Sequence, residues 1–194
     1  SRGLGDVYKR QDLNGHTLTI NGNLQQTSGT IFINGGTLKV KGDYSIENDN
    51  SPFYPILNMT NENDIVLIEG DFTTNSTADH KTYLTAGVME VKGNFSANYG
   101  GSYSGYCFNA TGNHKVVFNG TEKQNIHFDN AFGSGFSDVD FQNPNIEFDS
   151  EIRGWVLKRD TVINNDCVFS IKDKPLDLNG HTLTINGNLQ QTSG

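Results

Sequence analysis

The sequence is poor in residues that mark several common protein classes. Of its 194 residues, two are cysteine and four are proline, and hydrophobic residues make up only 34%. The two cysteines lie 60 positions apart, which is too few and too distant for a disulfide scaffold or a metal knuckle. We expect Cys107 and Cys167 to be small buried hydrophobes; a bridge between two turns of the fold is the alternative.

Basic residues are also scarce, and none of them gather in runs. Lys and Arg number 14 against 22 Asp and Glu, so the formal net charge is −8. This distribution lacks the basic patch with which proteins bind nucleic acid or anionic membranes. No stretch approaches the roughly 20 apolar residues of a transmembrane helix, and no signal peptide opens the chain. We therefore expect no nucleic-acid partner and no direct membrane insertion of this chain.

One long segment occurs twice. Residues 12–29 and 177–194 both read DLNGHTLTINGNLQQTSG, letter for letter. We interpret residues 12–176 as one long repeat and 177–194 as the start of the next, in a fragment of a longer tandem array. Residues 1–11, SRGLGDVYKRQ, lack the alternating pattern that leads into the second copy. They look like translated adaptor sequence from a metagenomic library, and we treat them as a non-native segment.

A shorter motif recurs within the long repeat. It reads apolar, any, apolar, any, Gly, Asn or Asp, apolar, as in LKVKGDY at 38–44 and MEVKGNF at 89–95. The spacing between successive motifs is about 20–28 residues, which is the range of solenoid coils. The motif glycines, which we assign to structural turns, are Gly22, Gly42, Gly70, Gly93, Gly120 and Gly187.

Apolar and polar residues alternate throughout residues 12–194, which is the signal of half-buried strands. In stacked parallel coils, Leu18 would lie on Leu38 and Val66, and Leu24 on Tyr44, so that each coil covers its neighbour. We expect the glycines to form corners because glycine readily adopts a positive φ. Antiparallel hairpins in a meander, sandwich or barrel are the alternative, because NG and GG are hairpin signals too. We favour an all-β, right-handed parallel solenoid with coils of about 20–28 residues.

Two segments carry a resemblance to known proteins. LDLNGHTLTINGNL at 176–189 resembles the coils of right-handed parallel β-helix proteins of the pectate-lyase-like type. FNATGNHKVVFNGTEKQNI at 108–126 looks like repeats of very large secreted proteins of gut Clostridia and their relatives. The resemblance implies a β-helix fold and a secreted or cell-surface location in a bacterium. It implies no activity.

Catalytic carboxylates are the first requirement of a polysaccharide-cleaving β-helix. Motifs of the polygalacturonase type are absent, and only Arg153 and Arg159 supply arginine after the suspected adaptor segment. Asp138 and Asp140 alternate on one strand and so share a face, which we expect to be the solvated one. We expect no catalytic site.

Metal sites are also not indicated. GGTLKVKGD at 35–43 departs from the calcium-binding nonapeptide pattern, and no histidine pair has metal-ligand spacing. His16 and His181 are one repeat position seen twice, which indicates a structural role. The remaining histidines, His80, His114 and His127, stand singly. We expect no metal and no cofactor.

The segment NYGGSYSGY at 98–106 holds the most distinctive side chains. Tyr99, Tyr103 and Tyr106 lie in a stretch of Gly and Ser, and such tyrosines can stack on sugar rings while their hydroxyls form hydrogen bonds. The alternative is a loop between coils whose tyrosines cover the edge of the core. We expect Trp155, the single tryptophan, to pack in the core.

Three functional hypotheses follow. The first is a non-catalytic structural repeat that forms a stalk or adhesin shaft and contacts neighbouring repeats of the same chain. The second is a carbohydrate-binding module centred on the three tyrosines, with host or plant glycans or surface proteins as partners. The third is a polysaccharide lyase or hydrolase.

Overall fold

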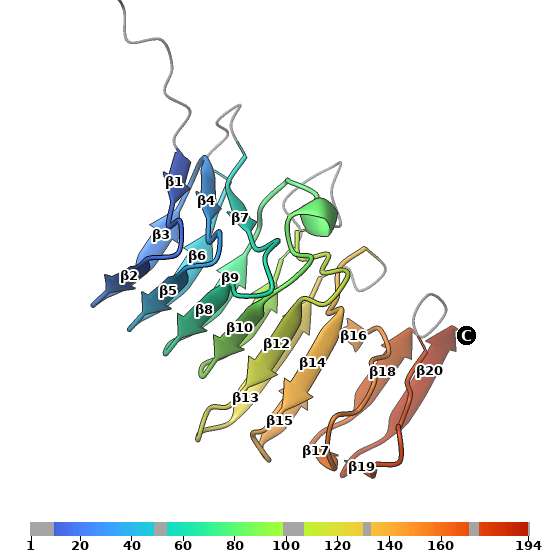
Figure 1. Ribbon diagram of the computed structural model, residues 1–194. Helices are drawn as coiled ribbons and strands as arrows, with labels where there is room; N and C mark the ends of the chain where they lie inside the picture. Colours follow the sequence, from blue (N-terminus) through green and yellow to red (C-terminus); the bar gives the residue numbers. More distant parts are fainter. Residues whose placement is uncertain (1–9, 49–53, 99–106, 130–132, 171–174, 194) are drawn as a thin grey trace, which may run out of the picture.

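Parallel strands stacked in about seven turns form the body of the computed structural model (Figure 1). The structure describes residues 10–48, 54–98, 107–129, 133–170 and 175–193. Within these residues the only helical element is a short 3₁₀ turn, η1 (His80–Thr82). The structure thus confirms the predicted all-β fold.

Two sheets run along most of the stack. The longer has eight strands, in the spatial order β3 (Leu24–Gln26), β6 (Tyr44–Ile46), β9 (Phe72–Thr74), β11 (Phe95–Ala97), β13 (Gln124–Phe128), β15 (Ile146–Phe148), β17 (Thr161–Ile163) and β19 (Leu183–Ile185). The second has six strands, in the order β2 (Thr17–Ile20), β5 (Thr37–Val40), β8 (Ile65–Ile68), β10 (Val88–Val91), β12 (Lys115–Phe118) and β14 (Asp138–Phe141).

Shorter sheets complete the turns at each end. The first contains β1 (Arg10–Asp12), β4 (Thr30–Phe32) and β7 (Ile56–Asn58), and the last contains β16 (Glu151–Ile152), β18 (Cys167–Ser170) and β20 (Leu189–Ser193). Every strand pair in the four sheets is parallel. This pairing excludes the antiparallel alternative, in which consecutive strands would form hairpins.

The predicted inward rows are in register. Leu18 pairs with Leu38 and Leu38 with Val66, while Leu24 pairs with Tyr44. From the second turn onward these side chains are at most 1% exposed, because each has a neighbour above and below. In the first turn Leu18 and Leu24 are only half-buried, since one of their faces lacks such a neighbour.

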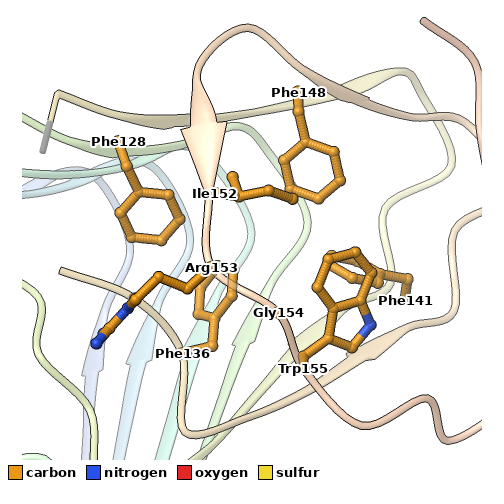
Figure 2. A pocket seen from close by; sticks show the side chains of 9 residues that line it. Phe128, Phe136, Phe141, Phe148, Ile152, Arg153, Gly154 and Trp155 are labelled. Carbon is orange, nitrogen blue, oxygen red and sulfur yellow. The ribbon is translucent and has the colours of Figure 1, made fainter. Parts of the chain in front are cut away.

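Aromatic rings fill the middle of the stack. The Phe95 ring lies 4.9 Å from Phe108 and 5.2 Å from Phe136 between centroids, both in edge-to-face geometry. Towards the C-terminal turns, Trp155 lies 5.4 Å from Phe141. Figure 2 shows this region, where a small cavity of about 10 Å³ remains beside the rings. Trp155 is 2% exposed, which confirms its predicted place in the core.

The stack changes its pattern after β14. Strand β17 pairs with β15, through Ile163 and Ile146, and therefore extends the eight-stranded sheet. As a result the two LTI segments lie in different sheets, the first in β2 of the six-stranded sheet and the second in β19 of the eight-stranded sheet. The same sequence segment therefore occupies a different sheet at each end of the stack.

Replacing Phe95 with Ala should lower the free energy of unfolding by about 3–5 kcal/mol, because it opens a cavity among rings that cannot collapse inward. Phe32→Ala is the control, since Phe32 is half-buried and packs under the Arg10 guanidinium at the stack end. Urea unfolding of both variants measures the difference. Equal losses would contradict a core centred on Phe95.

Candidate functional site

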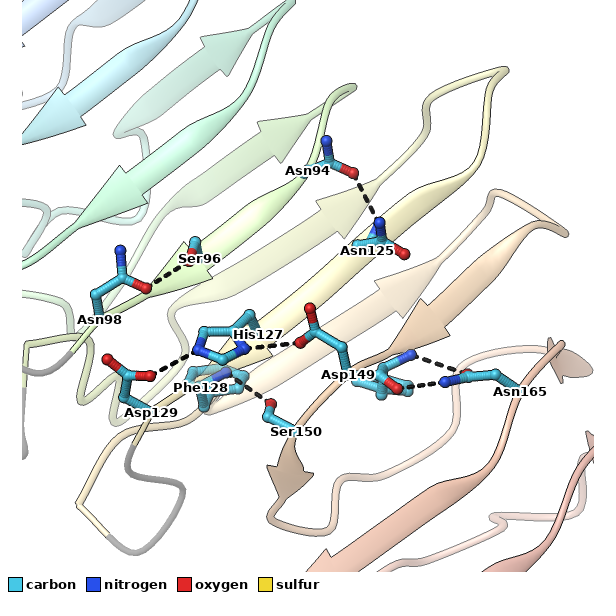
Figure 3. A network of polar contacts seen from close by, with 11 residues as sticks. Asn94, Ser96, Asn98, Asn125, His127, Phe128, Asp129, Asp149, Ser150 and Asn165 are labelled. Carbon is cyan, nitrogen blue, oxygen red and sulfur yellow. Dashed lines mark hydrogen bonds and ion pairs between the residues drawn. The ribbon is translucent and has the colours of Figure 1, made fainter.

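A ladder of Asn and Asp side chains joins the turns at the corner between the six-stranded and eight-stranded sheets. Asn23 Oδ1 accepts a hydrogen bond from Asp43 N at 2.9 Å, and Asp43 Oδ1 accepts one from Asp71 N at 2.9 Å. Asp71 Oδ1 then accepts one from Asn94 N at 2.7 Å, and Asn94 Oδ1 one from Asn125 N at 2.9 Å (Figure 3). Each side chain thereby accepts a hydrogen bond from a backbone amide of the next turn.

The motif glycines lie beside this ladder and stack backbone on backbone. Gly42 N donates to Gly22 O at 3.1 Å, Gly70 N to Gly42 O at 3.1 Å, and Gly93 N to Gly70 O at 3.0 Å. A Cβ at Gly70 would lie 2.7 Å from the carbonyl carbon of Gly42, inside van der Waals contact. The corner requires glycine because there is no space for a side chain.

The expected positive φ occurs at a different corner. Among the described residues, none of the six motif glycines has a positive φ. Left-handed backbone occurs instead in the Asn-Gly turns that precede the six-stranded sheet, for example at Asn34 (φ 47°) and Gly35 (φ 77°). Two corners of the coil therefore use glycine for two different physical reasons.

The glycine stack ends before Gly120. Gly120 N donates to Gln124 Oε1 at 3.0 Å, and Gln124 Nε2 donates to the carbonyl oxygens of Val91 and Gly93 at 3.0 and 2.6 Å. Asn143 Nδ2 in turn donates to Gln124 Oε1 at 2.9 Å. This buried amide pair was not predicted, and its only signal in the sequence is a Gln at an apolar-alternation position.

Gly70→Ala should destabilise the protein by at least about 2 kcal/mol, because the added methyl meets backbone that must shift. Gly22→Ala is the matched control: it has the same motif position, but its Cβ would meet nothing within 4 Å. We expect the free energy of unfolding of this variant to lie within about 0.5–1 kcal/mol of that of the wild type. Chemical denaturation monitored by circular dichroism compares them, and similar losses in both would refute the close-approach explanation.

His80 and His114, which are separate in the sequence, lie in one buried region. Both are at most 1% exposed, and within the described residues neither nitrogen of His114 has a hydrogen-bond partner. His80 Nδ1 lies 3.1 Å from the carbonyl oxygen of Ala78. Burial lowers the pKa of His80 to about 4, although the Ala78 carbonyl and Asp79 oppose this shift. Burial and the nearby His80 lower the pKa of His114 to about 3.

These lowered pKa values predict acid sensitivity. Above pH 6.5 both states of the chain carry neutral histidines, so the full stability is present. As the pH falls below 6.5, only the unfolded chain takes up these protons, and stability falls by about 1.4 kcal/mol per pH unit for each histidine. His114→Phe should therefore lose about 2 kcal/mol less than the wild type between pH 7 and pH 4.5 in urea unfolding.

The control for this acid test is His16→Phe, which replaces an exposed histidine and leaves both buried histidines in place. If His114→Phe also shows the wild-type dependence, acid destabilisation arises elsewhere.

A third polar group lies on the outer surface of the eight-stranded sheet (Figure 3). His127 bridges two carboxylates, with Nδ1 2.7 Å from Asp149 Oδ1 and Nε2 2.7 Å from Asp129 Oδ1. Partial burial would lower the pKa of His127, but the hydrogen bonds to both aspartates outweigh it and raise the pKa. The group links adjacent turns and presents a polar surface.

The two aspartates of strand β14 form ion pairs with lysine and arginine side chains. Asp140 accepts hydrogen bonds from Arg159 Nε at 2.5 Å and Nη2 at 2.9 Å, while Asp138 lies 3.8 Å from Lys115 Nζ and 3.4 Å from Lys158 Nζ. Asp140 is only 8% exposed, so the expectation that both carboxylates are solvated was wrong for Asp140. Burial would raise its pKa, but Arg159 holds it below the usual value. This geometry fits a structural ion-pair network.

Other residues singled out from the sequence are placed as follows. Tyr99, Tyr103 and Tyr106 lie outside the described residues. Cys107 and Cys167 are buried and not bonded to each other, which confirms the first interpretation of the cysteines. Within the described ranges, no three His, Cys, Asp or Glu side chains come together as metal ligands would.

An open hollow of about 370 Å³ lies at the first turn. Its lining includes Leu24 and Ile31, both half-buried, together with Arg10 and Gln25. The hollow combines apolar and hydrogen-bonding groups at one end of the stack.

In the part of the chain that the structure describes, no helix has the length and apolar character needed to cross a membrane. No protein-family model, curated protein or solved structure matches the sequence. The arrangement of the residues themselves is therefore the basis for any functional conclusion.

Proposed function

We propose that the chain is a non-catalytic structural unit that forms part of a stalk or adhesin shaft of a bacterial secreted or cell-surface protein. The supporting observation is the axial continuity of its bonding. Backbone pairing, the apolar rows and the Asn/Asp ladder all run from turn to turn in one direction. Such a stack gains length by adding turns, because each turn contacts only its neighbours.

The charged groups favour the same role. Asp138, Asp140 and His127 form ion pairs or hydrogen bonds with groups on adjacent turns, so these side chains help to join the turns. The resemblance to pectate-lyase-like repeats of large surface proteins supports the assignment, and we extend it to this chain as part of the proposal.

A chain in which residues 12–176 are duplicated in tandem tests the shaft. Small-angle X-ray scattering should show a maximum dimension longer by roughly 30–35 Å, about seven turns at ~4.8 Å each, with an unchanged cross-section. An increase in cross-section without this lengthening would contradict a shaft, because it would mean that each repeat folds as a separate closed body.

A further inference from the structure

Strand β8 is apolar on both of its faces. Its residues, Ile65–Ile68, read IVLI, and such a continuous apolar run is typical of a strand that is covered on both sides. Val66 and Ile68 point into the core and are at most 1% exposed. Ile65 and Leu67 point outward, and Ile65 is 37% exposed. The stack therefore covers one face of β8 and leaves the other accessible to a partner.

The neighbouring strands extend this outer face and place opposite charges on its two sides. Val88 on β10 lies beside Ile65 and is half-buried. At the level of Leu67, the residue on β5 is Lys39 and the residue on β10 is Glu90. We call these five residues the β8 face; its three strands lie side by side within the stack, between β2 and β12 (Figure 1). The face has an apolar centre between a cation and an anion.

The two charges of the β8 face do not neutralise each other. In the described part of the chain no ion pair joins Lys39 to Glu90, because Leu67 lies between them and two strand spacings, roughly 10 Å, separate their backbones. Lys39 is exposed. Glu90 Oε2 accepts a hydrogen bond from Asn119 Nδ2 at 2.9 Å, which leaves its negative charge in place. A partner that fits this face must therefore offer an anion and a cation on either side of apolar side chains.

We propose that the β8 face binds the β8 face of a second copy of this chain, about a two-fold axis that runs along β8 between the two sheets. This axis places Ile65 and Leu67 opposite their own counterparts. It also exchanges the two sides of β8, so that Lys39 of each molecule lies opposite Glu90 of the other. The apolar centre and both charges are then matched in one isologous contact.

The order of the charges selects the orientation of the partner. A two-fold axis across the strands would instead place Glu90 opposite Val88 and Lys39 opposite Thr37, so neither charge would be matched. Face-to-face sheets with nearly aligned strands pack about 10 Å apart, which leaves room for side chains of this size. Few side chains take part, so we expect the association to be weak. This inference goes beyond the proposed shaft and does not depend on it.

Reversing the charges tests the contact and its orientation. Sedimentation equilibrium of the full chain, at concentrations up to about 1 mM, should show a monomer–dimer equilibrium. Lys39→Glu and Glu90→Lys should each raise the dissociation constant about tenfold, because like charges then face each other. The double variant Lys39→Glu/Glu90→Lys should regain the wild-type constant. A wild type that stays monomeric would overturn the proposal and leave a different partner for the face. A double variant that associates no better than the single variants would also overturn it.

A cysteine at the centre of the β8 face locates the contact. Two Ile65→Cys molecules should be joined through the introduced thiols by a short bismaleimide, and a mixture of ¹⁵N-labelled and unlabelled chains should give cross-linked peptides that carry one label. Thr73→Cys is the control, because Thr73 points outward from the eight-stranded sheet. Cys107 and Cys167 are buried and common to both variants. Equal cross-linking of the two variants would contradict the assigned face. Thermal unfolding verifies that every variant folds, and the cross-link decides if a charge variant does not.

Discussion

Parallel pairing between successive turns is the constraint on which the rest of this structure depends. A single turn has three or fewer short strands, and it cannot satisfy its strand amides or cover its apolar side chains alone. Both needs are met only by the turns above and below. The register fixed by backbone pairing then aligns Leu38 over Leu18 and Tyr44 over Leu24, so that hydrogen bonding and core packing specify the same arrangement.

The corners follow from this stacking. Once turns are close enough for strands to pair, the corner backbones also approach, and Gly70 has no room for a side chain over Gly42. The adjacent Asn or Asp then hydrogen bonds along the stack, as Asp43 does to the amide of Asp71. Near Gly120 the segment between the glycine and the next strand is longer than at Gly93. There the buried Gln124 side chain makes the hydrogen bonds that the corner backbone no longer makes.

The periodic part of this design could be predicted from the sequence. Alternation and the recurring glycine motif indicated the parallel stack and its inward rows, because the same residues face the core in every turn. The prediction that the motif glycines adopt a positive φ was wrong. A recurring Gly in a sequence does not show whether it is needed for its backbone conformation or for its lack of a side chain. His80 and His114 lie 34 positions apart in the sequence and come close only when the turns stack, which no local pattern encodes. The sheet change after β14 was not predicted because none of the motif glycines lies between Gly120 and Gly187.

The central claim, that the turns stack axially in order along one sheet, can be measured with two spin labels. Gln25 in β3 and Thr184 in β19 are exposed and lie in the first and last strands of the eight-stranded sheet. Double electron–electron resonance should give a narrow distance distribution centred near ~34 Å, seven strand spacings of ~4.8 Å. A broad distribution, or a distance well below this value, would contradict the stacked solenoid.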